Sequence, residues 1–214
     1  MHIGSSSSLV ITSPDAPIDC LITLTPINIV QAAADLIWSN VFRRFPDVKV
    51  ALSEGGIGWI PYFLERVDYQ YKQHHVWTGQ DFGGRLPSEV FQERVLTCFI
   101  DDHFGVENRA HINMDNVMWE CDYPHSDSTW PFAPESLHSH FDGVSDHDVD
   151  RITHLNAMNH FSYDPFTALG GRANCTVGAL RAGAAGHDVS IRSTNASKVG
   201  QHATRAVDLA VPGN

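Results

Sequence analysis

Short apolar runs that break abruptly into acid, histidine and glycine dominate the pattern of this chain. Three such runs are Val48–Leu52 before Ser53-Glu54-Gly55-Gly56, Val95–Ile100 before Asp101-Asp102-His103, and Val117–Cys121 before Asp122. A strand covered on both faces of a parallel sheet has this continuous hydrophobic character. We therefore predict three strands here, and the tail of a fourth at Met1–Gly4.

The segments between these runs have helical spacing. Apolar residues recur every three or four positions in the first two segments, and the predicted helices are Ile27–Phe42, Pro61–Gln73, Glu107–Met114, Ser136–Phe141 and Asp146–His160. Ser145 and Asp148 resemble a capping box before the last of these helices. His74–Pro87 is polar, contains glycine and is predicted to be a loop. The alternation of strand and helix indicates an α/β fold with a parallel sheet.

The end of the chain has a different composition. Glycine and alanine become dense beyond Phe166, and Asn174–Asn214 contains no aromatic residue. We expect one compact region over 1–166 and a peripheral, partly disordered extension over 167–214.

Charge and cysteine content restrict the class of protein. The chain has 25 acidic against 14 basic residues and a formal charge of −11, so we expect neither nucleic-acid nor anionic-membrane binding. No apolar run approaches the roughly 18 residues of a membrane span, and no signal peptide is evident. The four cysteines form no CxxC pair, which favours reduced thiols in a cytoplasmic protein.

Asp122 is the strongest candidate for chemistry. An acid at the end of an apolar strand needs compensation of its charge, which a divalent metal or an acid/base role provides. A helix cap or an arginine pair is the structural alternative. Glu54 has a similar place, with a loop salt bridge as its alternative, and His125 is either a substrate ligand or a partner of Asp122. His2, by composition alone, is a surface histidine.

Other polar and aromatic residues carry less weight. Asp101, Asp102 and His103 also follow a strand, but three consecutive polar residues more often mark a solvated loop. His74-His75 lies at a helix exit, where a cation is favourable by itself. The tryptophans Trp59, Trp119 and Trp130 are interpreted as core or pocket wall.

Three segments together match the motifs of a known family. They are Phe42-Arg-Arg-Phe-Pro-Asp-Val-Lys-Val-Ala-Leu-Ser-Glu-Gly-Gly-Ile-Gly-Trp-Ile-Pro61, Met118-Trp-Glu-Cys-Asp-Tyr-Pro-His-Ser-Asp-Ser-Thr-Trp-Pro131 and Asn156-Ala-Met-Asn-His-Phe161. From Met1 to about Phe166 the chain resembles the amidohydrolase-2 family, in the branch that includes aminocarboxymuconate-semialdehyde decarboxylase and related nonoxidative decarboxylases. The resemblance implies the last four strand–helix units of a (β/α)8 TIM barrel.

The resemblance also implies a metal site, usually of zinc. Its ligands are a His-x-His at the first strand, a histidine at the fifth and an aspartate at the eighth, while a histidine at the sixth acts in catalysis. His2 matches the fifth-strand histidine and Asp122 the eighth-strand aspartate. Glu54 stands where the catalytic histidine is expected, and the first four strands with their His-x-His have no counterpart in the chain.

These residues lead to two hypotheses. The first is a metal-dependent hydrolase or carboxy-lyase for a small carboxylated or cyclic substrate. It has Glu54 and Asp122 as catalytic residues, His2 and Asp122 as metal ligands, and His125 and Trp130 as substrate-binding residues. The second is a truncated, inactive chain. A half-barrel leaves two sheet edges uncovered, and a homo-oligomer is one way to cover them.

Overall fold

The fold is built around a small parallel sheet. The computed structural model describes residues 1–4, 10–125 and 127–188. Strands β1 (Val50–Leu52), β2 (Val95–Phe99) and β3 (Val117–Trp119) pair in this order, and every pairing is parallel. Their carboxyl ends therefore meet at one edge. The three predicted strands are confirmed, with β1 beginning two residues later than expected.

The N-terminal segment extends this sheet beside β1. His2 forms an isolated parallel bridge with Ser53, and the amide of Ser53 donates to the carbonyl of Met1 at 2.8 Å. The amide of Gly4 donates to the side chain of the buried Asn28 at 2.7 Å, which anchors the segment to the helix that begins at Asn28. The predicted strand at Met1–Gly4 is thus present as a bridge.

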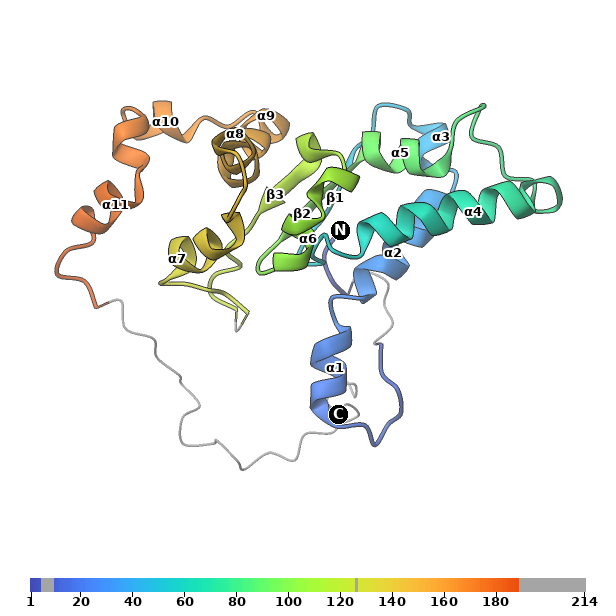
Figure 1. The fold of residues 1–214 in the computed structure, drawn as a ribbon, viewed down its shortest axis with the longest axis horizontal. Helices are drawn as coiled ribbons and strands as arrows, with labels where there is room; N and C mark the ends of the chain where they lie inside the picture. The colour runs from blue at the N-terminus through green and yellow to red at the C-terminus, as the bar shows by residue number, and fades with distance from the viewer. Residues whose placement is uncertain (5–9, 126, 189–214) are drawn as a thin grey trace.

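Helices flank the sheet on both sides in Figure 1. Those before β2 are α1 (Ile18–Leu24), α2 (Asn28–Trp38), α3 (Val41–Arg44), α4 (Ile60–Thr78) and α5 (Pro87–Arg94). Those after it are α6 (His103–Glu107), α7 (Ala133–His138), α8 (Asp146–Asp150), α9 (Asn156–Phe161), α10 (Pro165–Ala168) and α11 (Val177–Gly183). A π-helical segment, Arg151–Leu155, joins α8 to α9. An α/β fold with a parallel sheet is confirmed.

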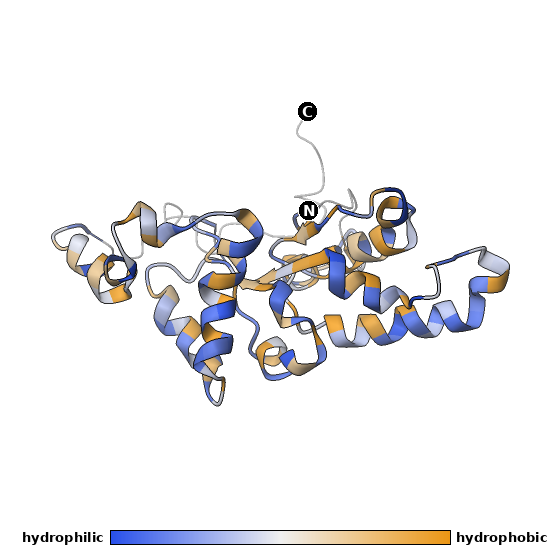
Figure 2. Ribbon diagram, turned by 90° about the horizontal axis from the view of Figure 1, so that it is seen from above, coloured by the Kyte–Doolittle hydropathy of each residue, from blue (hydrophilic) through white to orange (hydrophobic). Residues whose placement is uncertain are grey.

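The two faces of the sheet are covered differently. Leu52, Val95 and Phe99 belong to the main core, which includes buried residues of α2, α4 and α5. Leu96 and Cys98 project from the opposite face of β2, where they pack with Met118 in a second, smaller cluster. Every residue of β2 is buried, as its uninterrupted apolar run predicts. Figure 2 shows the hydrophobic colour along the strands, whereas the helices carry hydrophobic and hydrophilic bands side by side.

Several predicted helix boundaries are wrong. The helix predicted over Ile27–Phe42 ends at Trp38, and α3 follows it. The next helix, α4, continues to Thr78 into the predicted loop and ends where Gly79 adopts a φ of 70°. Glycine permits that left-handed cap, so the stop signal lay at Gly79 rather than at His74. After β2, a helix forms at α6 instead of Glu107–Met114.

One stretch of the described chain, Ile18–Trp38, has the length and composition of a membrane span, with a hydropathy of 1.6. This overturns the expectation that no apolar run approaches about 18 residues. The structure divides the stretch into α1 and α2, and α2 buries Ile29, Ala33 and Ile37 in the main core. The buried core helix of a globular protein has the same length and composition.

The C-terminal part was predicted to be a peripheral extension. Residues up to 188 form α10 and α11, which lie at one end of the molecule in Figure 1. Arg181 of α11 forms an ion pair with Glu135 of α7. The rest of the predicted extension, 189–214, lies outside the described residues. All four cysteines are described, and none of them forms a disulfide.

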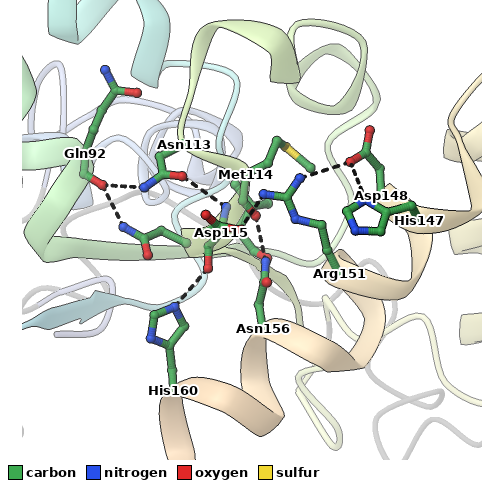
Figure 3. A network of polar contacts seen from close by, with 11 residues as sticks. Gln92, Asn113, Met114, Asp115, His147, Asp148, Arg151, Asn156 and His160 are labelled. Atoms are coloured by element: carbon green, nitrogen blue, oxygen red, sulfur yellow. Dashed lines mark hydrogen bonds and ion pairs between the residues drawn. The ribbon is translucent and has the colours of Figure 1, made fainter.

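A network of amide side chains fastens the amino ends of β2 and β3 (Figure 3). The side-chain nitrogen of Asn156 donates to the carbonyls of Met114 and Val117, at 2.7 Å each. Asn113 and Asn116 both donate to the carbonyl of Gln92, at 2.8 and 2.7 Å. These contacts satisfy the backbone of the turn that leads into β3. Asn156 begins the third family-like segment, so that segment has a structural role.

Candidate active site

Four side chains converge at the carboxyl edge of the sheet. His2 lies beside β1, Glu54 follows β1, and Asp122 and His125 follow β3. Nε2 of His2 is 2.7 Å from Oε1 of Glu54. Nδ1 of His125 is 2.8 Å from Oδ1 of Asp122 and 3.8 Å from Oε1 of Glu54. The structure thus brings together His2, Glu54 and Asp122, and it places the fourth candidate, His125, as a partner of Asp122.

Both carboxylates stand on left-handed backbone. Glu54 has a φ of 64° and Asp122 a φ of 54°, a region that costs a non-glycine residue roughly 1–2 kcal/mol. The neighbouring Gly55 is required for packing, because a Cβ atom there would lie 2.2 Å from Cγ2 of the buried Ile29. The Glu54 turn is therefore pressed against α2 and cannot relax in that direction.

Asp102 fastens the same turn from the end of β2. Its carboxylate accepts hydrogen bonds from the amides of Ile57 and Gly58, at 2.6 and 2.7 Å. It also caps α6 by accepting from the amide of Gly105 at 2.7 Å. Asp102 is a structural residue, and the interpretation of 101–103 as a solvated loop is wrong for it.

His2 is oriented by the backbone. Its Nδ1 lies 2.8 Å from the carbonyl of Ile3, which makes Nδ1 the donor and directs Nε2 toward Glu54. The pKa of His2 is raised above its usual value, first by this hydrogen bond and then by the nearby carboxylates Glu54 and Asp122, against the opposing effect of burial. A histidine whose second nitrogen donates to a carbonyl has the arrangement common among metal ligands.

Glu54 and Asp122 form a nearly buried carboxyl pair, with side chains 8% and 11% exposed. The pKa of Glu54 is raised, first by burial and then by its hydrogen bond with Asp122, while His2 lowers it. Two adjacent carboxylates disfavour double ionisation, so Glu54 holds a proton more readily than a free glutamate does. A bound cation removes this penalty.

The donor set fits a divalent metal. One ligand atom each from Glu54, Asp122 and His125 lies within 4.8 Å of the others, and His2 contacts the same Glu54 oxygen as His125. Carboxylate oxygen and imidazole nitrogen suit manganese and zinc alike, and the cluster contains no sulfur donor.

A family comparison identifies the group to which this arrangement belongs. A family model described as Amidohydrolase, that of the amidohydrolase-2 family, matches residues 1–161. The chain belongs to the amidohydrolase-2 family. The matched range contains all four residues of the cluster, and the resemblance predicted from the sequence is confirmed. No curated protein matches the chain.

Solved structures agree with this amidohydrolase-2 assignment at the level of the fold. An amidohydrolase from Mycobacterium avium subsp. paratuberculosis K-10 aligns at 22% identity and a TM-score of 0.54, over 64% of this chain and 34% of its own. The 5-carboxyvanillate decarboxylase LigW from Sphingomonas paucimobilis aligns at 22% identity and a TM-score of 0.55, over 75% and 46%. The chain thus spans a third to a half of the length of these proteins.

A third neighbour bears on the metal. The 5-carboxyvanillate decarboxylase LigW2 from Novosphingobium aromaticivorans DSM 12444, a D314N mutant, was solved with bound manganese; it aligns at 15% identity and a TM-score of 0.50, over 65% of this chain and 40% of its own. The manganese belongs to that neighbour, and at this identity the likeness to it shows the fold; zinc, expected from the resemblance, stays a prediction.

The remaining candidates make contacts outside the cluster. Trp130 is 41% exposed, its ring is tilted against that of Tyr123 with the centroids 4.9 Å apart, and it lines a groove with α11, so its role toward a substrate stays a prediction. Asp101 accepts from the buried His140 at 2.6 Å. The indole nitrogens of Trp59 and Trp119 donate to backbone carbonyls, and both rings pack against the core, as predicted.

One polar residue beside the cluster was missed in the sequence. The carboxylate of Glu120 accepts a hydrogen bond from the amide of Glu54 at 2.6 Å. Glu120 directly follows the apolar run of β3 and precedes Asp122 by two positions. The same strand-end argument that singled out Asp122 could have found it.

Proposed function

We propose that this chain carries part of the active site of a metal-dependent hydrolase or carboxy-lyase that acts on a small carboxylated or cyclic substrate. The observation that supports this most is the convergence of Glu54, Asp122 and His125 within 4.8 Å at the carboxyl edge of a parallel sheet. Enzymes with (β/α)8 barrels place their chemistry at that edge. We assign the segment of His2 and strands β1, β2 and β3 to the last four strand positions of such a barrel.

Each of the four side chains of the cluster has its own role in the proposed reaction. Asp122 and His2 hold the metal, and Glu54 and His125 present further donor atoms toward it. A bound divalent cation polarises a substrate oxygen or a water molecule. Glu54, whose carboxylate lies beside His2 and Asp122, exchanges a proton with the substrate. His125 is 64% exposed at its side chain and contacts the substrate from the open side.

Carboxy-lyase and hydrolase chemistry need different proton transfers. Loss of CO2 leaves a carbanion that Glu54 protonates at carbon, whereas hydrolysis requires a proton on the leaving nitrogen or oxygen. The structural likeness to a 5-carboxyvanillate decarboxylase makes hydroxylated aromatic carboxylates the first substrates to assay for CO2 release. Cyclic amides and esters are the matching hydrolase substrates.

Metal binding tests the proposal directly. Mn²⁺ and Zn²⁺ are titrated calorimetrically into the metal-free chain and into Asp122→Ala. We expect the wild-type chain to bind one ion, and the substitution to raise the Kd about 100-fold, since it removes a direct ligand. Asp127→Ala changes a neighbouring exposed acid and serves as the matched control.

A wild-type chain that binds neither ion overturns the proposal. That result supports the alternative hypothesis of an inactive chain without the His-x-His ligands. Binding that Asp122→Ala leaves unchanged contradicts the assignment of the site.

A further inference from the structure

The strained turn at Glu54 is held by a residue from the far strand of the sheet. The amide of Glu54 donates to Oε1 of Glu120 at 2.6 Å, although the two residues are 66 positions apart. Glu54 follows β1 and Glu120 follows β3, so the contact crosses the carboxyl end of β2. A carboxylate that accepts from an amide forms a stronger hydrogen bond than a neutral acceptor does.

Glu120 is itself anchored. Its backbone amide donates to the carbonyl of Phe99 at the end of β2, at 3.0 Å. Beneath it, the thiol of Cys98 donates to the carbonyl of Leu52 at 3.3 Å. Burial, followed by the charge of Glu120, raises the pKa of Cys98 to about 12, so the thiol stays neutral there. Glu120 thus links the carboxyl ends of all three strands, and the Cys98 thiol next to it is uncharged.

This anchoring has a consequence for the metal cluster. The carboxylate of Glu120 occupies the amide side of the Glu54 turn, while the side chain of Glu54 contacts His2 and Asp122. A residue keeps left-handed backbone only where its surroundings restrain it, and the Glu120 acceptor is one restraint of this turn beside Gly55 and Asp102. Loss of the Glu120 acceptor would free the Glu54 amide, the only one of these contacts made by Glu54 itself, and allow its carboxylate to leave its place beside Asp122.

We propose that Glu120 is a positioning residue, which holds Glu54 in its left-handed conformation and thereby keeps the Glu54 carboxylate in the cluster with His2 and Asp122. The inference rests on the proposed function for its metal readout only. Its structural readout, the Glu54 amide, is independent of any metal.

The experiment compares Glu120→Ala, Glu120→Gln and the control Glu107→Ala, whose side chain is exposed on α6. The alanine removes the acceptor, whereas glutamine keeps an acceptor oxygen of the same length. The ¹⁵N-labelled metal-free chain reports the shift and hydrogen exchange of the Glu54 amide. Calorimetry with Mn²⁺ then reports the affinity of the cluster.

We expect Glu120→Ala to move the Glu54 amide resonance upfield, to accelerate its exchange about 100-fold and to weaken Mn²⁺ binding about tenfold. Glu120→Gln should stay within about threefold of the wild type in both measurements, as should Glu107→Ala. A merely structural loss would lower the unfolding midpoint without this selective rescue by glutamine.

Three results overturn the inference. They are an unchanged Glu54 amide in Glu120→Ala, unchanged Mn²⁺ affinity in that variant, and a Glu120→Gln variant that is folded but leaves the Glu54 amide unprotected. If Glu120→Ala does not fold, the protection of the Glu54 amide in Glu120→Gln tests the inference instead. If the wild type binds no Mn²⁺, the proposed function fails, and the Glu54 amide alone decides on Glu120.

Discussion

The two edges of the sheet differ in the side chains they hold and in how these side chains are paired. At the amino edge, the side-chain amides of Asn113, Asn116 and Asn156 donate to backbone carbonyls, and these contacts join neutral groups (Figure 3). At the carboxyl edge, Glu54 and Asp122 place two carboxyl groups together on left-handed backbone. The amino edge thus supplies hydrogen-bond donors to backbone carbonyls, whereas the carboxyl edge holds adjacent carboxyl groups on strained backbone.

We infer from this difference that the amino edge stabilises the fold, whereas the carboxyl edge serves the proposed active site. A buried amide that bonds to carbonyls stabilises the fold at no electrostatic cost. A carboxyl pair costs stability until a cation or proton is present, and such local cost is typical of functional sites. Substitutions at the amino edge should therefore reduce stability, whereas substitutions at the carboxyl edge should alter binding and its pH dependence.

The largest effect on stability is expected for Asn156→Ala. The substitution leaves the carbonyls of Met114 and Val117 without their donor, and Asn156 itself is buried. We expect the free energy of unfolding to fall by about 3 kcal/mol in urea denaturation. Asn159→Ala, on the exposed side of the same helix, is the control and should change little. A loss below about 1 kcal/mol would show that the amino edge does not stabilise the fold.

Glu54→Gln should alter the pH dependence of stability in the metal-free chain. The folded pKa of Glu54 is raised, so its contribution to stability is complete below about pH 4.5 and is lost as the pH rises through the folded value. We expect the variant to be more stable than the wild type by about 1 kcal/mol at neutral pH, and the difference to vanish in acid. Denaturation curves from pH 4 to 8 test this; a difference that is constant with pH would contradict it.

The smallest effect is expected for Asp115→Ala in the amino-edge network. The Asp115 carboxylate is 2.6 Å from Arg151, but its side chain is 76% exposed, so water screens the pair. The loss of stability should be about 0.5 kcal/mol or less, although the contact is as short as those of Asn156. A cost that equals that of Asn156→Ala would show that charge, rather than buried amides, stabilises this edge.

Much of the carboxyl edge could be predicted from the chain alone. Apolar runs that end in Glu54 and Asp122 predict strands, and parallel strands bring their carboxyl ends to one edge, so the meeting of these two residues follows from a local pattern. His2, which contacts Glu54, was singled out only by the family resemblance. The family-like motifs carried the same residues, and the family assignment was confirmed.

Tertiary structure alone decided how those residues are held. The same residue type serves as a cluster carboxylate in Glu54 and as its backbone acceptor in Glu120, and Asp102, expected in a solvated loop, ties two turns together. Asn156 likewise shows its role only by the carbonyls it reaches, Met114 and Val117, about 40 residues earlier in the chain. The sequence determined the strands and the edge at which their polar residues gather, because alternating apolar and polar runs are local. It could not determine the partners of those residues, because a hydrogen bond depends on which distant backbone groups packing brings within about 3 Å.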